Sequence, residues 1–68
     1  MIISLTGSGK SRAREIYGHG VEQSILSALD ENGPASLDEL THDIGIDIVT
    51  VKDTAAKLAN KGFVRKED

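Results

Sequence analysis

The chain lacks cysteine, has little aromatic content and contains no long apolar run. Without cysteine its 68 residues have no disulfide, thiolate zinc ligand or cysteine nucleophile, so packing and helix-end hydrogen bonds must hold the fold. Tyr17 and Phe63 are the only aromatic residues, which disfavours the stacking platforms that bind single-stranded nucleic acid. No apolar run approaches the roughly 20 residues of a membrane span, and residues 1–5 are too short for a signal-peptide core. We expect a soluble intracellular protein without a membrane partner.

The small size of the chain also argues against an enzyme. With 38% apolar residues it can bury one modest core, which leaves no room for a deep cleft between two lobes. Its serine, histidine and aspartate residues do not have the spacing of a catalytic triad. His42 follows Asp38 by four residues, a spacing that offers two metal ligands and no third, and His19 stands alone between glycines. We expect no catalysis, no metal and no cofactor.

The most informative segment runs from Ser36 to Arg65. Ser36 and Glu39 have the spacing of a capping box, in which a hydroxyl and a carboxylate satisfy backbone donors at a helix start. Gly45 supplies the permissive backbone on which such a helix ends. One apolar stripe connects these signals, formed by Leu37, Leu40 and Ile44. The pattern predicts a helix over residues 37–44.

A second helix, over residues 48–61, should follow at once. Asp47 is its expected N-cap, and Gly62 stops it with Lys61 in the last turn. Its buried stripe consists of Val51, Ala55 and Leu58. Residues 63–66 then predict a strand.

Upstream, residues 21–31 predict the first helix of a three-helix core. Their apolar stripe consists of Val21, Ile25, Ala28 and Leu29, with Leu26 beside it. Gly33 and Pro34 end this helix, and Ala35 can form a short extended segment that leads into Ser36. The β-prone residues 1–5 are the best candidate for a further strand, paired either beside residues 63–66 or across a dimer interface with a second copy.

Together these residues resemble a winged helix-turn-helix domain. The matching positions are Leu40, Gly45-Ile46-Asp47, Thr50-Val51, Ala55, Leu58 and Gly62-Phe63-Val64. The resemblance implies a mainly α fold with a small β element: a three-helix core plus a short sheet with a truncated wing. It places the domain at residues 21–68, after a basic N-terminal arm at residues 1–20. Domains with this pattern look like those of bacterial and archaeal transcription regulators, so the resemblance implies double-stranded DNA binding in the cytoplasm or nucleoid.

The charge distribution indicates which surface would meet DNA. Residues 21–50 carry seven acidic residues and no lysine or arginine, whereas residues 1–20 and 51–68 each have a net charge of +2. The residues expected to contact DNA are Val49, Thr50, Lys52, Asp53, Ala56, Lys57, Lys61, Arg65 and Lys66. Basic side chains would neutralise phosphates, and Thr50 would hold the helix start against the DNA backbone. Val49 or Ala56 would touch thymine methyl groups, while Asp53 or Asn60 would read base edges.

Two alternatives remain open at this stage. Ile48, Val49 and Ala56 form a small apolar patch inside a charged rim, which would suit a protein-protein interaction module in a transcription or replication assembly. The same residues also fit an ordinary amphipathic helix with solvated charges.

A glycine-rich segment near the N-terminus imitates a phosphate-binding loop. Thr6-Gly7-Ser8-Gly9-Lys10-Ser11 resembles the end of a P-loop, but the first glycine of that motif would stand at the position of Ser4. The chain is also too short for the several parallel strands of such a fold. We expect no nucleotide hydrolysis and interpret the segment as a flexible hinge with a basic flank. Its Lys10, Arg12 and Arg14 are candidate contacts of an arm with DNA phosphates.

Overall fold

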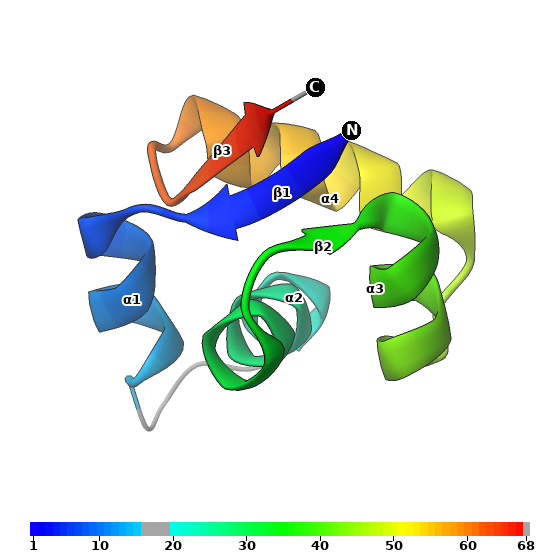
Figure 1. Cartoon of the computed structure of the whole chain (residues 1–68), viewed down its shortest axis with the longest axis horizontal. Coiled ribbons are helices and arrows are strands. Elements are labelled where there is room, and N and C mark those ends of the chain that lie inside the picture. The colour runs from blue at the N-terminus through cyan, green and yellow to red at the C-terminus, as the bar shows by residue number, and fades with distance from the viewer. Residues whose placement is uncertain (16–19, 68) are drawn as a thin grey trace.

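The computed structural model describes residues 1–15 and 20–67, which form helices packed against one face of a small sheet (Figure 1). The elements in chain order are β1 (Ile2–Leu5), α1 (Gly7–Ala13), α2 (Gly20–Asn32), β2 (Ala35–Ser36), α3 (Leu37–Ile44), α4 (Ile48–Asn60) and β3 (Val64–Glu67). The fold is therefore mainly helical with a small antiparallel sheet, as the sequence predicts at this level. In the described part of the chain, no helix is long and apolar enough to cross a membrane.

The predicted capping box of α3 is present. The Ser36 hydroxyl accepts a hydrogen bond from the Glu39 amide, and the Glu39 carboxylate accepts one from the Ser36 amide, both at 3.1 Å. Gly45 ends the helix in the left-handed region, at φ 71°. These end signals explain why the predicted bounds of α3 agree with the structure.

The bounds of α4 and β3 also lie close to the prediction. The Asp47 carboxylate accepts from the Thr50 amide at 3.0 Å, which confirms Asp47 as the N-cap of α4. At the other end the Phe63 amide donates to the Leu58 carbonyl at 2.9 Å. Phe63 therefore closes the last turn of the helix, and β3 begins one residue later than predicted.

The N-terminal strand occupies the centre of the sheet, whose order is β2-β1-β3. β1 pairs with β3 from Leu5 opposite Val64 to Ile2 opposite Glu67, and with β2 through Ile3 opposite Ala35. Of the two pairings that the sequence left open, the structure has the one within the chain. The short extended segment predicted at Ala35 is also confirmed.

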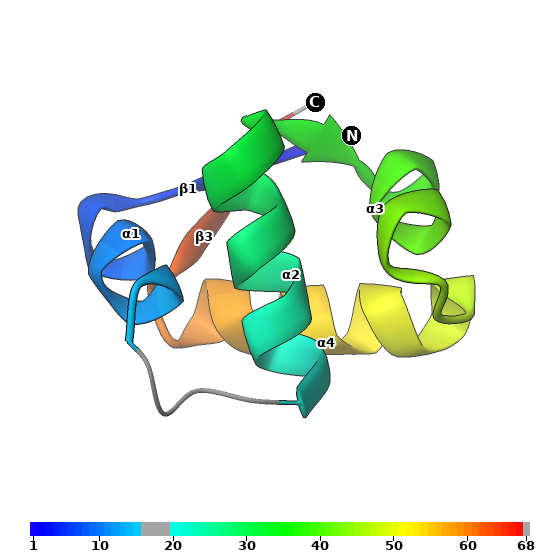
Figure 2. The same ribbon diagram turned by 90° about the horizontal axis from the view of Figure 1, so that it is seen from below.

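The hydrophobic core lies between the inner face of this sheet and helices α2, α3 and α4 (Figure 2). Ile3 brings the central strand into that core, and the predicted inward stripe of α4 is buried with it. The fully buried larger side chains are Ile3, Ile25, Leu26, Leu40, Val51 and Leu58. Among the described residues no polar or charged residue is buried as a whole, so apolar contact is the main cohesive force.

The flexible hinge expected after β1 is wrong, because residues 7–13 form α1. Thr6 is the N-cap: its hydroxyl accepts from the Gly9 amide at 3.0 Å and donates to the Gly62 carbonyl at 2.6 Å. The Thr6 amide also donates to the Phe63 carbonyl at 3.0 Å. A glycine-rich segment with low helix propensity is thus held as a helix by contacts with the distant joint between α4 and β3.

The first prediction concerns core packing. Leu58 is completely buried, so Leu58→Ala should lower the free energy of unfolding by about 2 to 5 kcal/mol through lost contacts and a cavity. Val49→Ala, on the same helix but at a side chain that is 64% exposed, should stay within about 0.5 kcal/mol of the parent. Urea unfolding of both variants measures the difference, and equal midpoints would contradict this packing.

A second prediction separates two glycines of α1. A Cβ added at Gly9 would overlap the carbonyl of Phe63, whereas one added at Gly7 meets no atom within 4 Å. Gly9→Ala should therefore destabilise by about 1 to 3 kcal/mol, since backbone must shift. Gly7→Ala should be neutral or stabilising by up to about 1 kcal/mol, because alanine favours the helix. Thermal melts of the pair provide the measurement, and similar melting temperatures would argue against this docking of α1.

Candidate nucleic-acid interface

The outward ridge of α4 is exposed, as its helical periodicity predicts. Val49 is the most exposed large apolar residue in the part of the chain that the structure describes, and Asp53 and Asn60 are exposed along the same ridge. Ala56, which the sequence places on this ridge, is half-buried. Lys52 and Lys57 are exposed on its flanks. The ridge itself thus presents small apolar and polar groups, with positive charge beside it.

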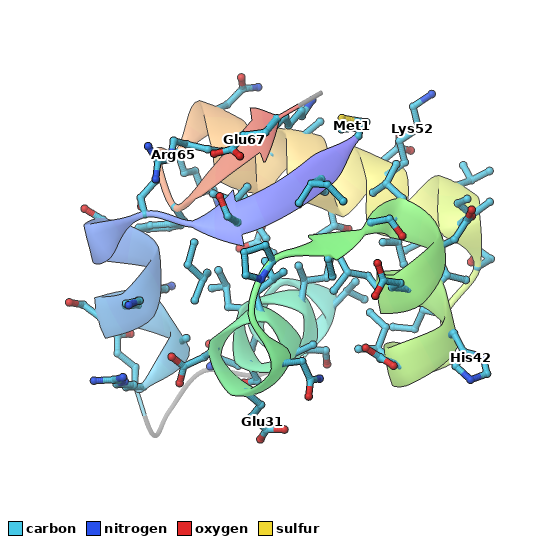
Figure 3. All side chains as sticks on the ribbon, viewed as in Figure 1. Met1, Glu31, His42, Lys52, Arg65 and Glu67 are labelled. Atoms are coloured by element: carbon cyan, nitrogen blue, oxygen red, sulfur yellow. The ribbon has the colours of Figure 1, made fainter. Side chains whose placement is uncertain are left out.

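β3 adds two further cations close to α4. Arg65 and Lys66 are both exposed, and they lie on opposite faces of the strand because side chains alternate along it. Figure 3 shows Lys52 and Arg65 toward opposite ends of α4. Positive charge is therefore spread along the length of α4 and continues onto the neighbouring strand.

Lys61 has a closer partner than its position at the end of α4 suggested. Its ammonium group lies 3.0 Å from the carboxylate of Glu22 on α2, with side chains 51% and 36% exposed. Such a surface pair contributes at most about 1 kcal/mol to stability, so a phosphate can still compete for the ammonium group. Lys61 is nevertheless less available to DNA than Lys52 or Lys57, for which the structure shows no ion pair with a described residue.

Thr50 is committed to the helix cap. Its hydroxyl donates to the Asp47 carboxylate at 2.8 Å while its amide donates to the same carboxylate at 3.0 Å. These two hydrogen bonds lower the pKa of Asp47 below its ordinary value of 3.8, and the bond from the backbone amide has the larger effect. The Thr50 hydroxyl can donate to a DNA phosphate only if it leaves Asp47.

The three basic residues predicted as arm contacts lie on or just after α1 and have different surroundings. Arg12 pairs with Glu15 at 3.1 Å and lies 5.8 Å from the centre of the Phe63 ring. Arg14 lies 3.6 Å from Asp30 on α2. Lys10 lines an open groove that Arg14 and Arg65 also line. Sequence reasoning missed this last association, since no local signal connects α1 with β3.

Among the described residues, the structure does not form the phosphate-binding loop or the metal site that parts of the sequence imitate. Two amides of the glycine-rich segment, those of Gly9 and Lys10, are bonded to the hydroxyl and carbonyl of Thr6 within the first turn of α1. In a P-loop such amides face a phosphate instead. Among residues 1–15 and 20–67 no three histidines or carboxylates gather as metal ligands, while His19 and Tyr17 lie outside the described residues.

An exposed apolar patch adjoins the start of α4. Its members are Met1, Ile2, Ile48 and Val49, which are 38% to 64% exposed. A shallow groove of about 230 Å³ runs past Met1 and Ile48, between the beginnings of β1, α3 and α4. Sequence reasoning identified the two α4 residues of this patch, but not Met1 or Ile2 at the start of the chain.

Comparison of the chain with protein-family models, curated proteins and solved structures finds no match. The assignment of a role to these surfaces therefore rests on their geometry and charge.

The third prediction follows from the Asp47 cap. The pKa of the Asp47 carboxyl is lower in the folded state than in the unfolded state. The carboxylate therefore stabilises the fold at pH values above its pKa in the unfolded state, and this stabilisation is lost as the pH falls through its pKa in the folded state. Asp47→Ala should therefore unfold at lower urea than the parent at pH 7, and this gap should narrow below about pH 4. Asp53→Ala is the control, because the Asp53 carboxylate has no hydrogen-bond or ion-pair partner among the described residues. An Asp47→Ala gap that stays constant with pH would argue against the cap.

Proposed function

We propose that the chain is a winged helix-turn-helix domain that binds double-stranded DNA in transcriptional regulation, in the cytoplasm or nucleoid. The observation that carries this proposal is the exposed ridge of α4 between Lys52 and Lys57, neither of which has an ion-pair partner among the described residues. An α-helix fits the major groove of B-DNA, and α4 is anchored for such a role by its N-cap and by the buried stripe on its opposite side. α3 and the left-handed turn at Gly45 connect it to the core.

The distribution of charge supports the same orientation. Helices α2 and α3 carry most of the acidic residues, whereas the basic residues are found on α1, α4 and β3 or directly beside them. A duplex placed along α4 would meet Lys52 and Lys57 and then, at β3, Arg65 or Lys66, whose side chains project from opposite faces of the strand. These cations would contact phosphates, which position the protein without reading sequence.

Sequence preference would come from the ridge. Val49 is exposed enough to contact a thymine methyl group, and Asn60 can donate to or accept from a base edge. Asp53 is the discriminating member, since a carboxylate near phosphates is repelled unless it accepts from a cytosine amino group. Lys61 contributes less, because Glu22 competes for it.

The competing proposal is a protein-docking role for the same end of α4. It is favoured by the apolar patch, in which Met1 and the neighbouring Ile2 extend the exposed Ile48 and Val49. The two roles predict a different dependence of binding affinity on salt concentration. DNA binding through phosphates should weaken steeply as salt rises, whereas apolar docking should not.

Titration of a labelled mixed duplex pool at two salt concentrations tests the proposal directly. The slope of log affinity against log salt should be steeply negative, by roughly 0.9 for each phosphate contact. Absence of binding at 50 mM salt would refute the DNA role. A protein-docking role would then be tested by the loss of partner binding in Val49→Asp.

The fourth prediction uses the difference between two lysines of one helix. Lys57→Ala should reduce the salt slope by roughly one unit and weaken binding to all duplexes alike. Lys61→Ala should reduce it by less, because Glu22 already neutralises that ammonium group. Equal losses would show that the ion pair does not persist in the complex.

Asp53→Ala provides the matching test of specificity. If the carboxylate reads a base, the variant should lose discrimination of about 1 to 3 kcal/mol at one base pair. If the carboxylate only repels phosphates, every duplex should bind more tightly. A variant unchanged in both respects would place Asp53 away from DNA.

A further inference from the structure

A groove of about 490 Å³ lies between α1, the outer face of the sheet and the C-terminal end of α2. It is lined by Ser4, Leu5, Lys10, Arg14, Leu29, Asp30, Gly33, Pro34, Arg65 and Glu67. The groove therefore brings together two ends of the chain that are more than 50 residues apart. Its position is distinct from the exposed ridge of α4.

Three of the lining side chains are cationic and exposed. Arg65 stands opposite Ser4 in the pairing of β1 with β3, so its side chain projects from the outer face of the sheet. Lys10 approaches from α1, and Arg14 follows at the end of the same helix with a side chain that is 70% exposed. Lys10 and Arg65 have no ion-pair partner among the described residues.

We propose that this groove binds a phosphate of the DNA backbone, as a second contact site in addition to α4. The proposal rests on the DNA-binding function and extends it. Arg65 connects the two surfaces, because β3 follows α4 directly and also borders the groove. A duplex strand that passes from α4 over β3 would thus reach Lys10 and Arg14.

The composition of the groove favours a phosphate over a base. No aromatic side chain is present among its lining residues, so a base would have nothing to stack on. Arginine and lysine are the usual partners of phosphate oxygens, and Arg65 can offer two parallel N–H donors. The Ser4 hydroxyl, buried in the lining and without a hydrogen-bond partner among the described residues, is a further donor at this face.

Two carboxylates in the groove limit where the phosphate can lie. Asp30 already holds Arg14 at 3.6 Å, which leaves part of that guanidinium free. Glu67 is two residues beyond Arg65 on the same face of β3, roughly 7 Å further along the strand. Figure 3 shows Arg65 at the end of β3 near α1, with Glu67 further from that helix. The phosphate therefore lies at the Lys10 end.

The test compares two basic residues of α1 in duplex-binding titrations. Lys10→Ala should lower the salt slope by roughly 0.9, the value of one phosphate contact. Arg12→Gln is the matched control, since Arg12 pairs with Glu15 and does not line the groove, and it should have a clearly smaller effect. Equal effects of the two variants, or none from Lys10→Ala, would overturn the proposal.

In a second pair of variants the expected effect is tighter, not weaker, binding to duplex DNA. Glu67→Gln removes a repulsive carboxylate from the groove and should tighten duplex binding severalfold at low salt. Glu31→Gln removes the same charge from the exposed end of α2 outside the groove and controls for net charge. Circular dichroism melts of each variant exclude unfolding as the cause of a change. If Glu67→Gln binds no better than Glu31→Gln, the groove does not hold phosphate.

Two further measurements distinguish a DNA phosphate from inorganic phosphate, and a failure of the groove proposal from a failure of the DNA-binding function. Amide chemical shifts of Lys10 and Arg65 should respond to duplex DNA, and a response to inorganic phosphate alone at equal ionic strength would overturn the backbone assignment. If the parent binds no duplex, the DNA-binding function fails and this proposal with it. If binding depends on Lys52 and Lys57 but not on Lys10, only the groove proposal fails.

Discussion

The placement of α1 and of both ends of the chain depends on the junction between Thr6 and the loop after α4. This one residue donates its amide to the Phe63 carbonyl and its hydroxyl to the Gly62 carbonyl, and it receives the amide of Gly9. These hydrogen bonds hold the end of β1 against the start of β3, begin α1 and keep the end of α4 in place. Gly9 permits the close approach because any side chain there would overlap Phe63.

Local signals in the sequence were sufficient for α3 and α4 but not for α1. Capping residues and a left-handed glycine act within a few positions, so they predicted the ends of α3 and the start of α4 closely. α1 has a local N-cap in Thr6, but its glycine and serine residues are weak helix formers. Its helix depends on Thr6 bonding to Gly62, which is 56 residues away in the chain. A contact between residues so far apart in the chain produces no periodic pattern in the sequence from which the helix could be predicted.

The candidate interface shows the same division. Helical periodicity predicted that Val49, Asp53 and Asn60 would be exposed, because the inward stripe of α4 fixes the opposite ridge. It could not predict that Lys61 meets Glu22, or that Lys10 and Arg65 line one groove. Those associations depend on strand order and helix packing. The central position of β1, whose end brings the start of α1 to the joint between α4 and β3, is the step on which the groove depends.

The core consists of apolar side chains, and the charged side chains of the described residues all lie outside it. Since no described charged residue is buried, substitutions of the charged residues on α4 or in the groove remove no buried side chain from the core. Their effects on binding can therefore be measured in a folded protein, which is an advantage in so small a domain. The same separation means that the fold places few demands on its outer residues, so fold alone does not decide between DNA and protein as partner. That decision depends on the surface, where cations without an ion-pair partner among the described residues flank α4 and continue through Arg65 into the groove; the proposal of DNA as the partner rests on this distribution of charge.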